Sequence, residues 1–212
     1  MKKIIIILFF TLLADNERNS ISTPWEKITL DTSKAYLVFR GTDSKPGAIA
    51  REFNLFDLKS SHVGIAVFNN DLWNISHIVN TRDPVSDLKW DTFASFLDQK
   101  KQKVFYASVW EINSLTPKEF KSLKGLLETY RKKQYRFDQS FSIKDDNRLY
   151  CSELIQKILT TVNADKFQFK LHTKKLRPLY ASFFRKDSLS YYPVDMFQKH
   201  KNFTLVEEWD LN

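Results

Sequence analysis

Short runs of apolar and β-branched residues, separated by polar turns, predict several β-strands in the first half of the chain. The runs lie at residues 34–41, 61–68, 72–79 and 103–110, and another lies near the C-terminus at residues 203–209. Asn69-Asn70 separates the second run from the third, and such a pair is typical of a tight hairpin turn. We therefore expect a β-hairpin over residues 61–79.

Helical periodicity dominates two later segments. Thr116, Pro117 and Glu119 form a capping box with proline in the first turn, so a helix is expected to begin there. Its apolar face would carry Phe120, Leu123, Leu127 and Tyr130. A second helix is expected from about residue 149, with Asn147 as its cap. Its apolar face would carry Cys151, Leu154, Ile155, Ile158 and Leu159.

A shorter helix is expected over residues 92–99, capped by Asp91 or Thr92. The order is then strands, helices and a last strand, which favours an α+β fold over an alternating, doubly wound one. The hydrophobic content of 42% excludes a disordered chain, and 212 residues suffice to bury one core. Because no repeat or linker interrupts the pattern, we expect residues 15–212 to form a single domain.

Residues 1–14 have a different composition. Lys2 and Lys3 precede an apolar run at residues 4–13, and the small residue Ala14 follows it. This layout is typical of a secretory signal peptide, so we expect export to the periplasm or the extracellular space. No cysteine follows the run, which argues against a lipoprotein anchor, and no later run is long enough to span a bilayer.

The charge narrows the range of partners only slightly. The formal net charge of +8 becomes +6 without Lys2 and Lys3 (8 − 2), and this excess leaves peripheral attraction to an anionic envelope surface open. The sequence has no zinc-ligand spacing, glycine-rich phosphate loop or nucleic-acid motif. We therefore expect no metal, no cofactor and no nucleic-acid partner.

Cys151 is the single cysteine of the chain, so it cannot form an internal disulfide. Such a thiol is either a small buried hydrophobe or a reactive group. In the first turn of a helix, the exposed N–H groups and the positive end of the dipole favour a thiolate. We therefore expect the pKa of Cys151 to be lowered.

A thiolate nucleophile works with an imidazole that moves its proton. His62 and His77 lie in the two strands of the expected hairpin, whereas His172 and His200 lie among lysines. A two-residue turn at Asn69-Asn70 would place His62 directly opposite His77, so that one imidazole could act as the base and the other could orient it.

Other residues than His77 could take the third position, which orients the base. A turn of odd length would bring Ser76 or Ile78 opposite His62, with Asn74 on the same face as Ser76. Gly64 shares the face of His62 and would let a substrate backbone or the cysteine helix approach closely.

The segments SHVGIAV (61–67) and LYCSEL (149–154), in this order, resemble the circularly permuted papain-like amidases, in particular the YiiX/YebB-like cysteine hydrolases related to the NlpC group. AYLVFRG (35–41), Tyr135-Arg-Phe-Asp138 and Tyr192-Pro-Val-Asp195 resemble further parts of that family, and the likeness spans about residues 34–209. The resemblance implies a permuted papain-like fold, in which an antiparallel sheet or partial barrel carries the histidine and packs against helices that include the cysteine helix.

The same resemblance implies roles for individual residues. Cys151 would be the nucleophile and His62 the general base and acid. The third position varies in the family, and we expect His77 there, with Ser76 and Asn74 as alternatives. Glu153 matches the family motif, and we expect it to be structural.

These expectations together describe an exported cysteine hydrolase. It would cleave an amide or ester bond through a thioester, and its substrate would be a cell-wall peptide or a lipid-linked molecule. Two alternatives stay open: a lipid or amine acyltransferase on the same core, and a non-catalytic envelope-binding module in which Cys151 is only buried.

Overall fold

The computed structural model describes residue 25 and residues 28–81, 83–98, 103–143, 145 and 147–211. The expected signal segment, residues 1–14, lies outside the described residues. None of the helices in the described ranges is both long and apolar enough to cross a bilayer.

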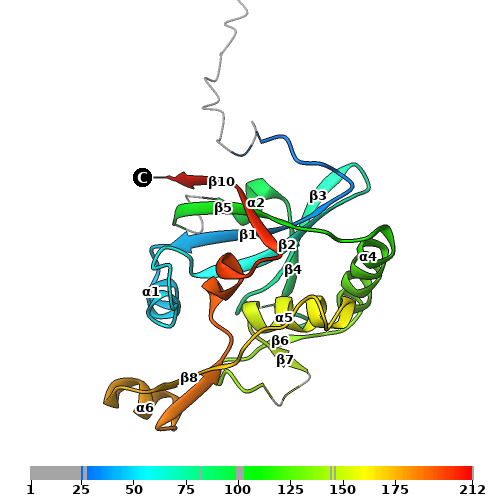
Figure 1. The fold of residues 1–212 in the computed structure, drawn as a ribbon. Helices are drawn as coiled ribbons and strands as arrows, with labels where there is room; N and C mark the ends of the chain where they lie inside the picture. The colour runs from blue at the N-terminus through cyan, green and yellow to red at the C-terminus, as the bar shows by residue number, and fades with distance from the viewer. Residues whose placement is uncertain are drawn as a thin grey trace, which may run out of the picture.

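A six-stranded antiparallel sheet forms the centre of the molecule (Figure 1). Its strands, in chain order, are β1 (Ala35–Thr42), β2 (His62–Asn69), β3 (Leu72–Ile78), β4 (Leu88–Asp91), β5 (Val104–Ile112) and β10 (Phe203–Asp210). Their order across the sheet is β10-β5-β1-β2-β3-β4, and every neighbouring pair is antiparallel. The histidine strands β2 and β3 therefore lie toward one edge of the sheet.

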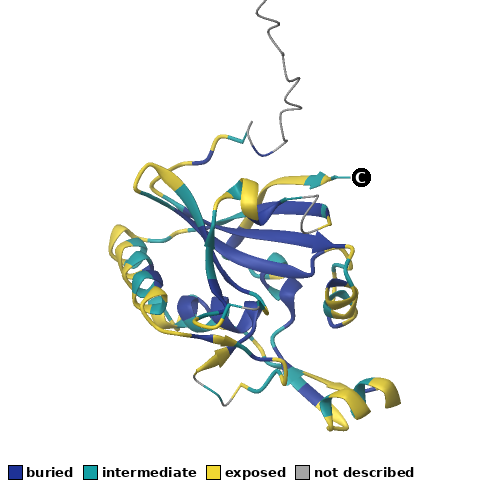
Figure 2. Cartoon of the chain, turned by 180° about the vertical axis from the view of Figure 1, so that it is seen from behind, coloured by how far each residue is buried: buried dark blue, intermediate teal, exposed yellow. Residues whose placement is uncertain are grey.

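Both faces of the sheet are covered. On one face, α4 (Pro117–Arg131) and α5 (Cys151–Val162) pack against Val63, Ile65 and Val67 of β2. On the other face, α2 (Phe93–Phe96) and the following Leu97 pack against alternate residues of the same strands, such as Ala66 and Ile75. Figure 2 shows the resulting buried centre. The expected α+β organisation is present as a large antiparallel sheet packed against helices.

Smaller elements surround this core. Helix α1 (Lys45–Glu52) follows β1, and the short parallel pair β6 (Arg136–Phe137) and β7 (Arg148–Leu149) leads into α5. The antiparallel pair β8 (His172–Lys175) and β9 (Ser188–Tyr191) encloses α6 (Pro178–Phe184), and we call residues 172–191 the arm. The arm extends away from the sheet (Figure 1). A 3-10 helix, η2 (Val194–Lys199), then leads to β10.

The hairpin turn lies one residue later than its sequence indicates. Asn69 still pairs with Leu72, and the two turn residues are Asn70 and Asp71, with φ of 50° and 60°. Two such residues fit the type I′ turn, which accommodates the twist of a hairpin. The register is therefore shifted by two residues, and the prediction that His62 lies directly opposite His77 is wrong. Because the shift is even, both histidines still share one face.

The start of the cysteine helix also differs from the prediction. Its N-cap is Tyr150, without a side-chain cap hydrogen bond, rather than Asn147. Residues 148–149 stay extended because they pair with β6, so the helix cannot begin earlier. Cys151 is consequently the first residue of α5.

Candidate active site

His62 and His77 contact each other across the hairpin. Nε2 of His62 lies 2.9 Å from Nδ1 of His77, and both rings pack against the ring of Phe96. The contact is diagonal, because Ile65 pairs with Ser76 and His77 therefore falls beside Gly64. The expected imidazole pair is thus present, although in another register than predicted.

Asp91 extends this pair to a third group. Its Oδ2 lies 3.0 Å from Nε2 of His77, and β4 places it there by pairing antiparallel with β3. The Asp91 side chain is 28% exposed, whereas His77 is buried, so the carboxylate sits at the solvent side of the chain of contacts. The hydrogen bond from His77 holds the pKa of Asp91 below its ordinary value.

The carboxylate determines where the protons of this relay lie. Burial lowers the pKa of His77, despite the opposing effect of Asp91, and burial lowers the pKa of His62 strongly, so both rings are neutral at pH 7. An ionised carboxylate only accepts, so Nε2 of His77 carries the proton and its Nδ1 accepts from Nε2 of His62. Nδ1 of His62 is then left with its lone pair, which is the arrangement that a general base requires.

Cys151 lies against the start of β2, the strand that begins with His62. It belongs to the core cluster that contains Val63, and the backbone N–H of Val63 is within hydrogen-bonding reach of the sulfur. The N–H groups of Ser152 and of Cys151 itself also reach the sulfur. The thiol therefore lies beside the residue that follows His62, with three backbone donors around it.

The pKa of Cys151 is raised, which contradicts the expectation from its helix position. Burial is the largest cause, and it outweighs the backbone N–H groups and the nearby guanidinium of Arg40, which act in the opposite direction. The expectation considered the helix N-terminus but not desolvation. In the free protein the thiol is thus protonated at pH 7.

Arg40 is a buried cation that the sequence interpretation did not single out. It pairs with His62 across β1 and β2, and its Nη1 donates to the carbonyl of Phe96 at 2.5 Å. Its guanidinium carbon lies 4.4 Å from the centre of the Phe96 ring, and its Nε has no hydrogen-bond partner among the described residues. Burial lowers the pKa of Arg40 to about 10, so it keeps its charge at pH 7. Its positive charge acts to lower the pKa values of His62 and His77, and it partly offsets the rise that burial causes in the pKa of Cys151.

Gly64 makes room for the relay. A Cβ atom at this position would lie 2.6 Å from Cγ2 of Ile75 and 3.2 Å from Cβ of His77. The close neighbour is therefore strand β3, and not the cysteine helix or a substrate as expected. The absence of a side chain at residue 64 lets the strand that carries His77 approach.

The alternatives to His77 lie elsewhere. Ser76 and Asn74 alternate with His77 along β3, so they point to the opposite face of the sheet. Nδ2 of Asn74 donates to the carbonyls of Asn69 and Leu72 and so holds the hairpin turn. The hydroxyl of Ser76 is buried and has no hydrogen-bond partner in the described part of the chain. Only His77 of the three contacts His62.

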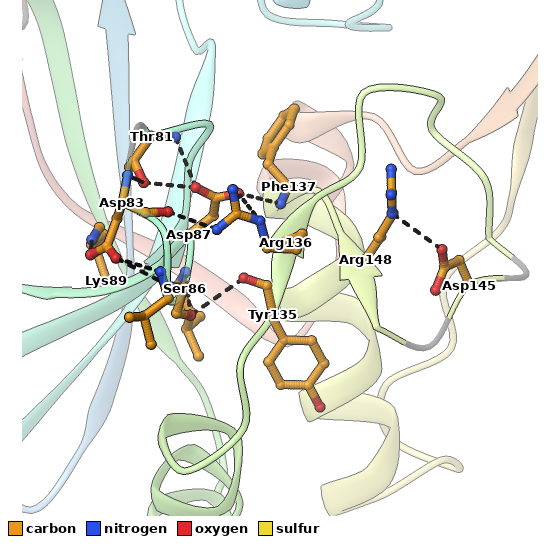
Figure 3. A network of polar contacts seen from close by, with 12 residues as sticks. Thr81, Asp83, Ser86, Asp87, Lys89, Tyr135, Arg136, Phe137, Asp145 and Arg148 are labelled. Carbon is orange, nitrogen blue, oxygen red and sulfur yellow. Dashed lines mark hydrogen bonds and ion pairs between the residues drawn. The ribbon is translucent and has the colours of Figure 1, made fainter.

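A polar network attaches the histidine strands to the segment that leads into the cysteine helix (Figure 3). The carboxylate of Asp87, just before β4, accepts hydrogen bonds from Thr81 and from the N–H of Phe137 in β6. The N–H of Asp87 in turn donates to the carbonyl of Tyr135 at 2.8 Å. Since β6 pairs with β7, and β7 ends next to Cys151, Asp87 fixes the position of the thiol relative to β3 and β4.

The Tyr192-Pro-Val-Asp195 segment attaches to the site from the other end of the chain. The carboxylate of Asp195 accepts from the backbone N–H groups of residues 55–57, in the loop that precedes β2. The carbonyl of Tyr192 accepts from the hydroxyl of Ser152 at 2.6 Å, and its N–H donates to the hydroxyl of Tyr150 at 2.9 Å. This turn therefore holds both the cysteine helix and the loop before His62.

Glu153 is fully buried two residues after the cysteine. Lys157 Nζ lies 3.3 Å from its Oε1, but neither carboxylate oxygen has a well-aligned hydrogen bond among the described residues. Burial raises the pKa of Glu153 to about 7, so its neutral form persists to a higher pH than that of an exposed glutamate. Lys157, one turn along the helix, and the backbone of Tyr150 act in the opposite direction and favour the carboxylate.

Asp91 and Arg40 are the residues of this site that the sequence interpretation missed. Asp91 directly precedes Thr92, and the sequence predicts either residue as a helix cap; Thr92 is the cap in the structure. The sequence signal for Asp91 is its place at the end of a short strand, and the signal for Arg40 is a lone cation in an otherwise apolar strand.

No protein-family model matches the chain, and no curated protein is similar to it in sequence. Among solved structures, the fold is similar to the crystal structure of the metalloprotein YiiX from Escherichia coli O157:H7, with a TM-score of 0.63. The alignment has 16% sequence identity and covers 83% of this chain and 97% of the YiiX chain. Within the described ranges, no group of three or more His, Cys, Asp and Glu residues is arranged to hold a metal ion. The comparison thus shows that this chain has a YiiX-like fold.

Proposed function

We propose that the protein is a cysteine hydrolase that cleaves an amide or ester bond. Cys151 is the nucleophile, His62 the general base and acid, and His77 with Asp91 the relay that fixes the tautomer of His62. One observation carries the proposal: the single thiol of the chain lies beside the strand residue next to His62, whose ring is connected through His77 to a carboxylate. The histidine strand precedes the cysteine helix, which supports the permuted papain-like order.

The relay supports a defined first step. As the Cys151 sulfur attacks the substrate carbonyl, its proton passes to Nδ1 of His62. The resulting imidazolium donates from Nε2 to His77, and the negative charge of Asp91 stabilises it through that ring. The neutral thiol and neutral imidazole of the free protein thus become charged only during the reaction.

The later steps return both groups to their starting state. The imidazolium gives its proton to the leaving amine or alcohol, and a thioester remains on Cys151. A water molecule then loses a proton to His62 and attacks the thioester, which releases the acid and restores the thiol. The backbone N–H of Cys151, at the first position of α5, is suited to bind the developing oxyanion. One such donor is worth about 3 kcal/mol.

The substrate class follows from the sequence rather than from the site. The signal-like start and the resemblance favour a cell-envelope substrate, a peptide or a lipid-linked molecule. Acyl transfer to an amine or an alcohol would use the same thioester, with the acceptor in place of water.

A non-catalytic binding module is favoured by one observation, the raised pKa of the buried thiol. The two functions differ in what they require of His62. A catalytic Cys151 needs the lone pair on Nδ1, whereas a buried structural thiol is indifferent to it.

The test is to trap the thioester. The protein is mixed with p-nitrophenyl acyl esters of different chain length and with acyl-peptide amides, and its intact mass is followed over time. We expect a transient acyl adduct on Cys151 in the wild type, no adduct in Cys151→Ala, and slow formation in His62→Ala. His172→Ala, which changes a histidine of the arm, serves as the matched control and should behave as the wild type.

Wild-type turnover in Cys151→Ala, with an unchanged melting temperature, would overturn the proposal. An adduct that forms equally fast in His62→Ala would favour the binding module. A shift of product from free acid to an amide or ester, when an amine or alcohol is added, would assign acyl transfer.

A further inference from the structure

The outer face of α6 carries apolar side chains that nothing in the described structure covers. Leu179 is 76% exposed and Phe183 is 70% exposed, and their spacing of four residues places them side by side on the helix. Tyr180 and Phe184 lie on the inner face, where they contact Phe53 at ring distances of 5.5 and 6.2 Å. The inner face therefore anchors the helix, and the outer face is free to bind a partner.

Cations surround this face. Residues 172–186 contain five lysines and arginines and neither aspartate nor glutamate. Those residues are Lys174, Lys175, Arg177, Arg185 and Lys186, and all are exposed. Arg177 forms an ion pair with Glu52 of α1. Lys174 donates to the backbone carbonyl of Glu52 and lies 5.0 Å from the centre of the Phe53 ring, and Lys186 donates to the backbone carbonyl of Ser140. Most of the positive charge of the arm is thus available to an external anion.

A second exposed apolar segment adjoins the core of the arm. Leu55, Phe56 and Leu58 are 42%, 60% and 73% exposed, and they lie within five residues after Phe53. Hydrogen bonds to Asp195 fix the backbone of this loop. In Figure 2 the arm projects from the molecule with most of its surface exposed.

We propose that the arm docks on an anionic lipid bilayer, with Leu179 and Phe183 in the interface and the surrounding lysines and arginines on the phosphate groups. Exposed Leu and Phe next to cations are the composition of helices that lie in a membrane interface. An anionic polymer would use the cations but not the apolar side chains. A second copy of the chain would bring two basic arms together, which charge repulsion opposes. The proposal does not depend on the activity of Cys151.

The test is co-sedimentation of the full chain with vesicles of phosphatidylcholine alone or mixed with phosphatidylglycerol. We expect binding to the anionic vesicles to be at least about tenfold stronger than to the neutral ones and to weaken with added salt. The double change Leu179→Ser with Phe183→Ser should lower this binding at least about tenfold. The matched control is Leu72→Ser, which alters an exposed leucine of the hairpin turn. Because all variants share residues 4–13, differences between them report on the arm.

A second measurement follows insertion directly. The variant Phe183→Trp adds a tryptophan whose emission is obtained by comparison with the wild type. This added emission should shift to shorter wavelength when anionic vesicles are added. Binding that survives Leu179→Ser with Phe183→Ser, without such a shift, would assign a purely electrostatic surface and overturn the proposal. Equal binding of all variants, or no binding, would also overturn it, as would a concentration-dependent dimer that the double change abolishes.

Discussion

The two halves of the candidate site are equally buried but differ in their polar partners. His62 on the sheet and Cys151 at the helix are 8% and 7% exposed. On the sheet, a continuous relay leads from His62 through His77 to the carboxylate of Asp91. On the helix, backbone N–H groups and the guanidinium of Arg40 act on the thiol, and the carboxylate of Glu153 lacks a well-aligned hydrogen bond among the described residues.

The difference shows that burial alone does not determine how a group reacts. On the sheet, the carboxylate fixes the tautomers of two neutral rings before any substrate arrives. On the helix, desolvation raises the pKa values of both Cys151 and Glu153, so their neutral forms are favoured. In the proposed mechanism, the base is thus prepared in advance, whereas the nucleophile becomes charged only when its proton moves to His62.

The largest effect should come from removing the charge of Asp91, which orients His77 and, through it, His62. In Asp91→Asn, the side-chain amide can donate to Nε2 of His77, which would reverse both tautomers and place a proton on Nδ1 of His62. We expect kcat/KM for the ester substrate to fall by about 10²- to 10⁴-fold, as in related relays. The melting temperature should change little, because Asp91 is partly exposed. An Asp91→Asn variant with wild-type kcat/KM would show that the relay does not direct the proton.

The next largest effect is expected from Asp87, which connects the histidine strands to the segment before the cysteine helix. Asp87→Ala leaves the N–H groups of Phe137 and Thr81 without their acceptor, and we expect the free energy of unfolding to fall by about 2–4 kcal/mol. Chemical denaturation measures this. Asp83→Ala is the matched control: this carboxylate belongs to the same network but pairs with Lys89 near the surface, so its loss should destabilise the protein much less than Asp87→Ala does.

Acid should diminish the effect of Asp87→Ala. Burial alone would raise the pKa of Asp87, but the hydrogen bonds from Phe137 and Thr81 and the nearby Arg136 hold it below its ordinary value. Its stabilising contribution is therefore present above the ordinary aspartate pKa and is lost as pH falls through the lowered one. A difference between wild type and variant that grew in acid would contradict this assignment.

A smaller effect is expected from replacing Arg40, whose charge acts on the thiol of Cys151. Arg40 lowers the pKa of Cys151, so Arg40→Met should raise that pKa further. We expect alkylation of the thiol by iodoacetamide at pH 7 to slow several-fold, while Arg40→Lys keeps the charge and should stay closer to the wild type. The midpoint of the rate measured against pH should lie above the pKa of a free thiol, about 8.5. Rapid labelling well below that pH in the wild type would instead indicate a thiolate in the free protein.

The smallest effect should come from Glu153. Its pKa in the folded protein is about 7, above that of an unfolded glutamate, so the folded state loses stability as pH rises from about 4.5 to 7. Glu153→Gln removes this loss, and its melting temperature should depend less on pH over that interval than that of the wild type. Identical pH dependence of the two proteins would show that Lys157 fully compensates the carboxylate.

Local patterns in the sequence predicted the elements well. Capping at Thr116 and the helical face from Cys151 to Leu159 depend only on neighbours in the chain, and both are present. The turn was displaced by one residue because Asn69, Asn70 and Asp71 all suit a turn, and only pairing across the strands selects among them. Since the displacement changed the register by an even number, the shared face of His62 and His77 was retained.

Features that depend on the folded surroundings could not be predicted in the same way. Asp91 reaches His77 only because β4 pairs with β3, and nothing in the sequence of residues 79–87 indicates a hairpin of that register. The pKa of Cys151 depends on how much apolar material covers α5, which its position in the helix does not reveal. Contacts between distant strands and desolvation are properties of packing, and these were the parts that the sequence left open.

The hydrogen bonds of Asp195 to residues 55–57 have a consequence for the order in which the site is assembled. They join positions 138 to 140 residues apart. A ribosome must therefore synthesise residue 195 before the loop ahead of His62 has its acceptor, and contacts of such long range form late in folding. Nascent chains that stop short of residue 195 would carry both His62 and Cys151 without the segment that holds them in place. Such a dependence would keep the thiol unproductive until residue 195 has been synthesised and has joined this loop.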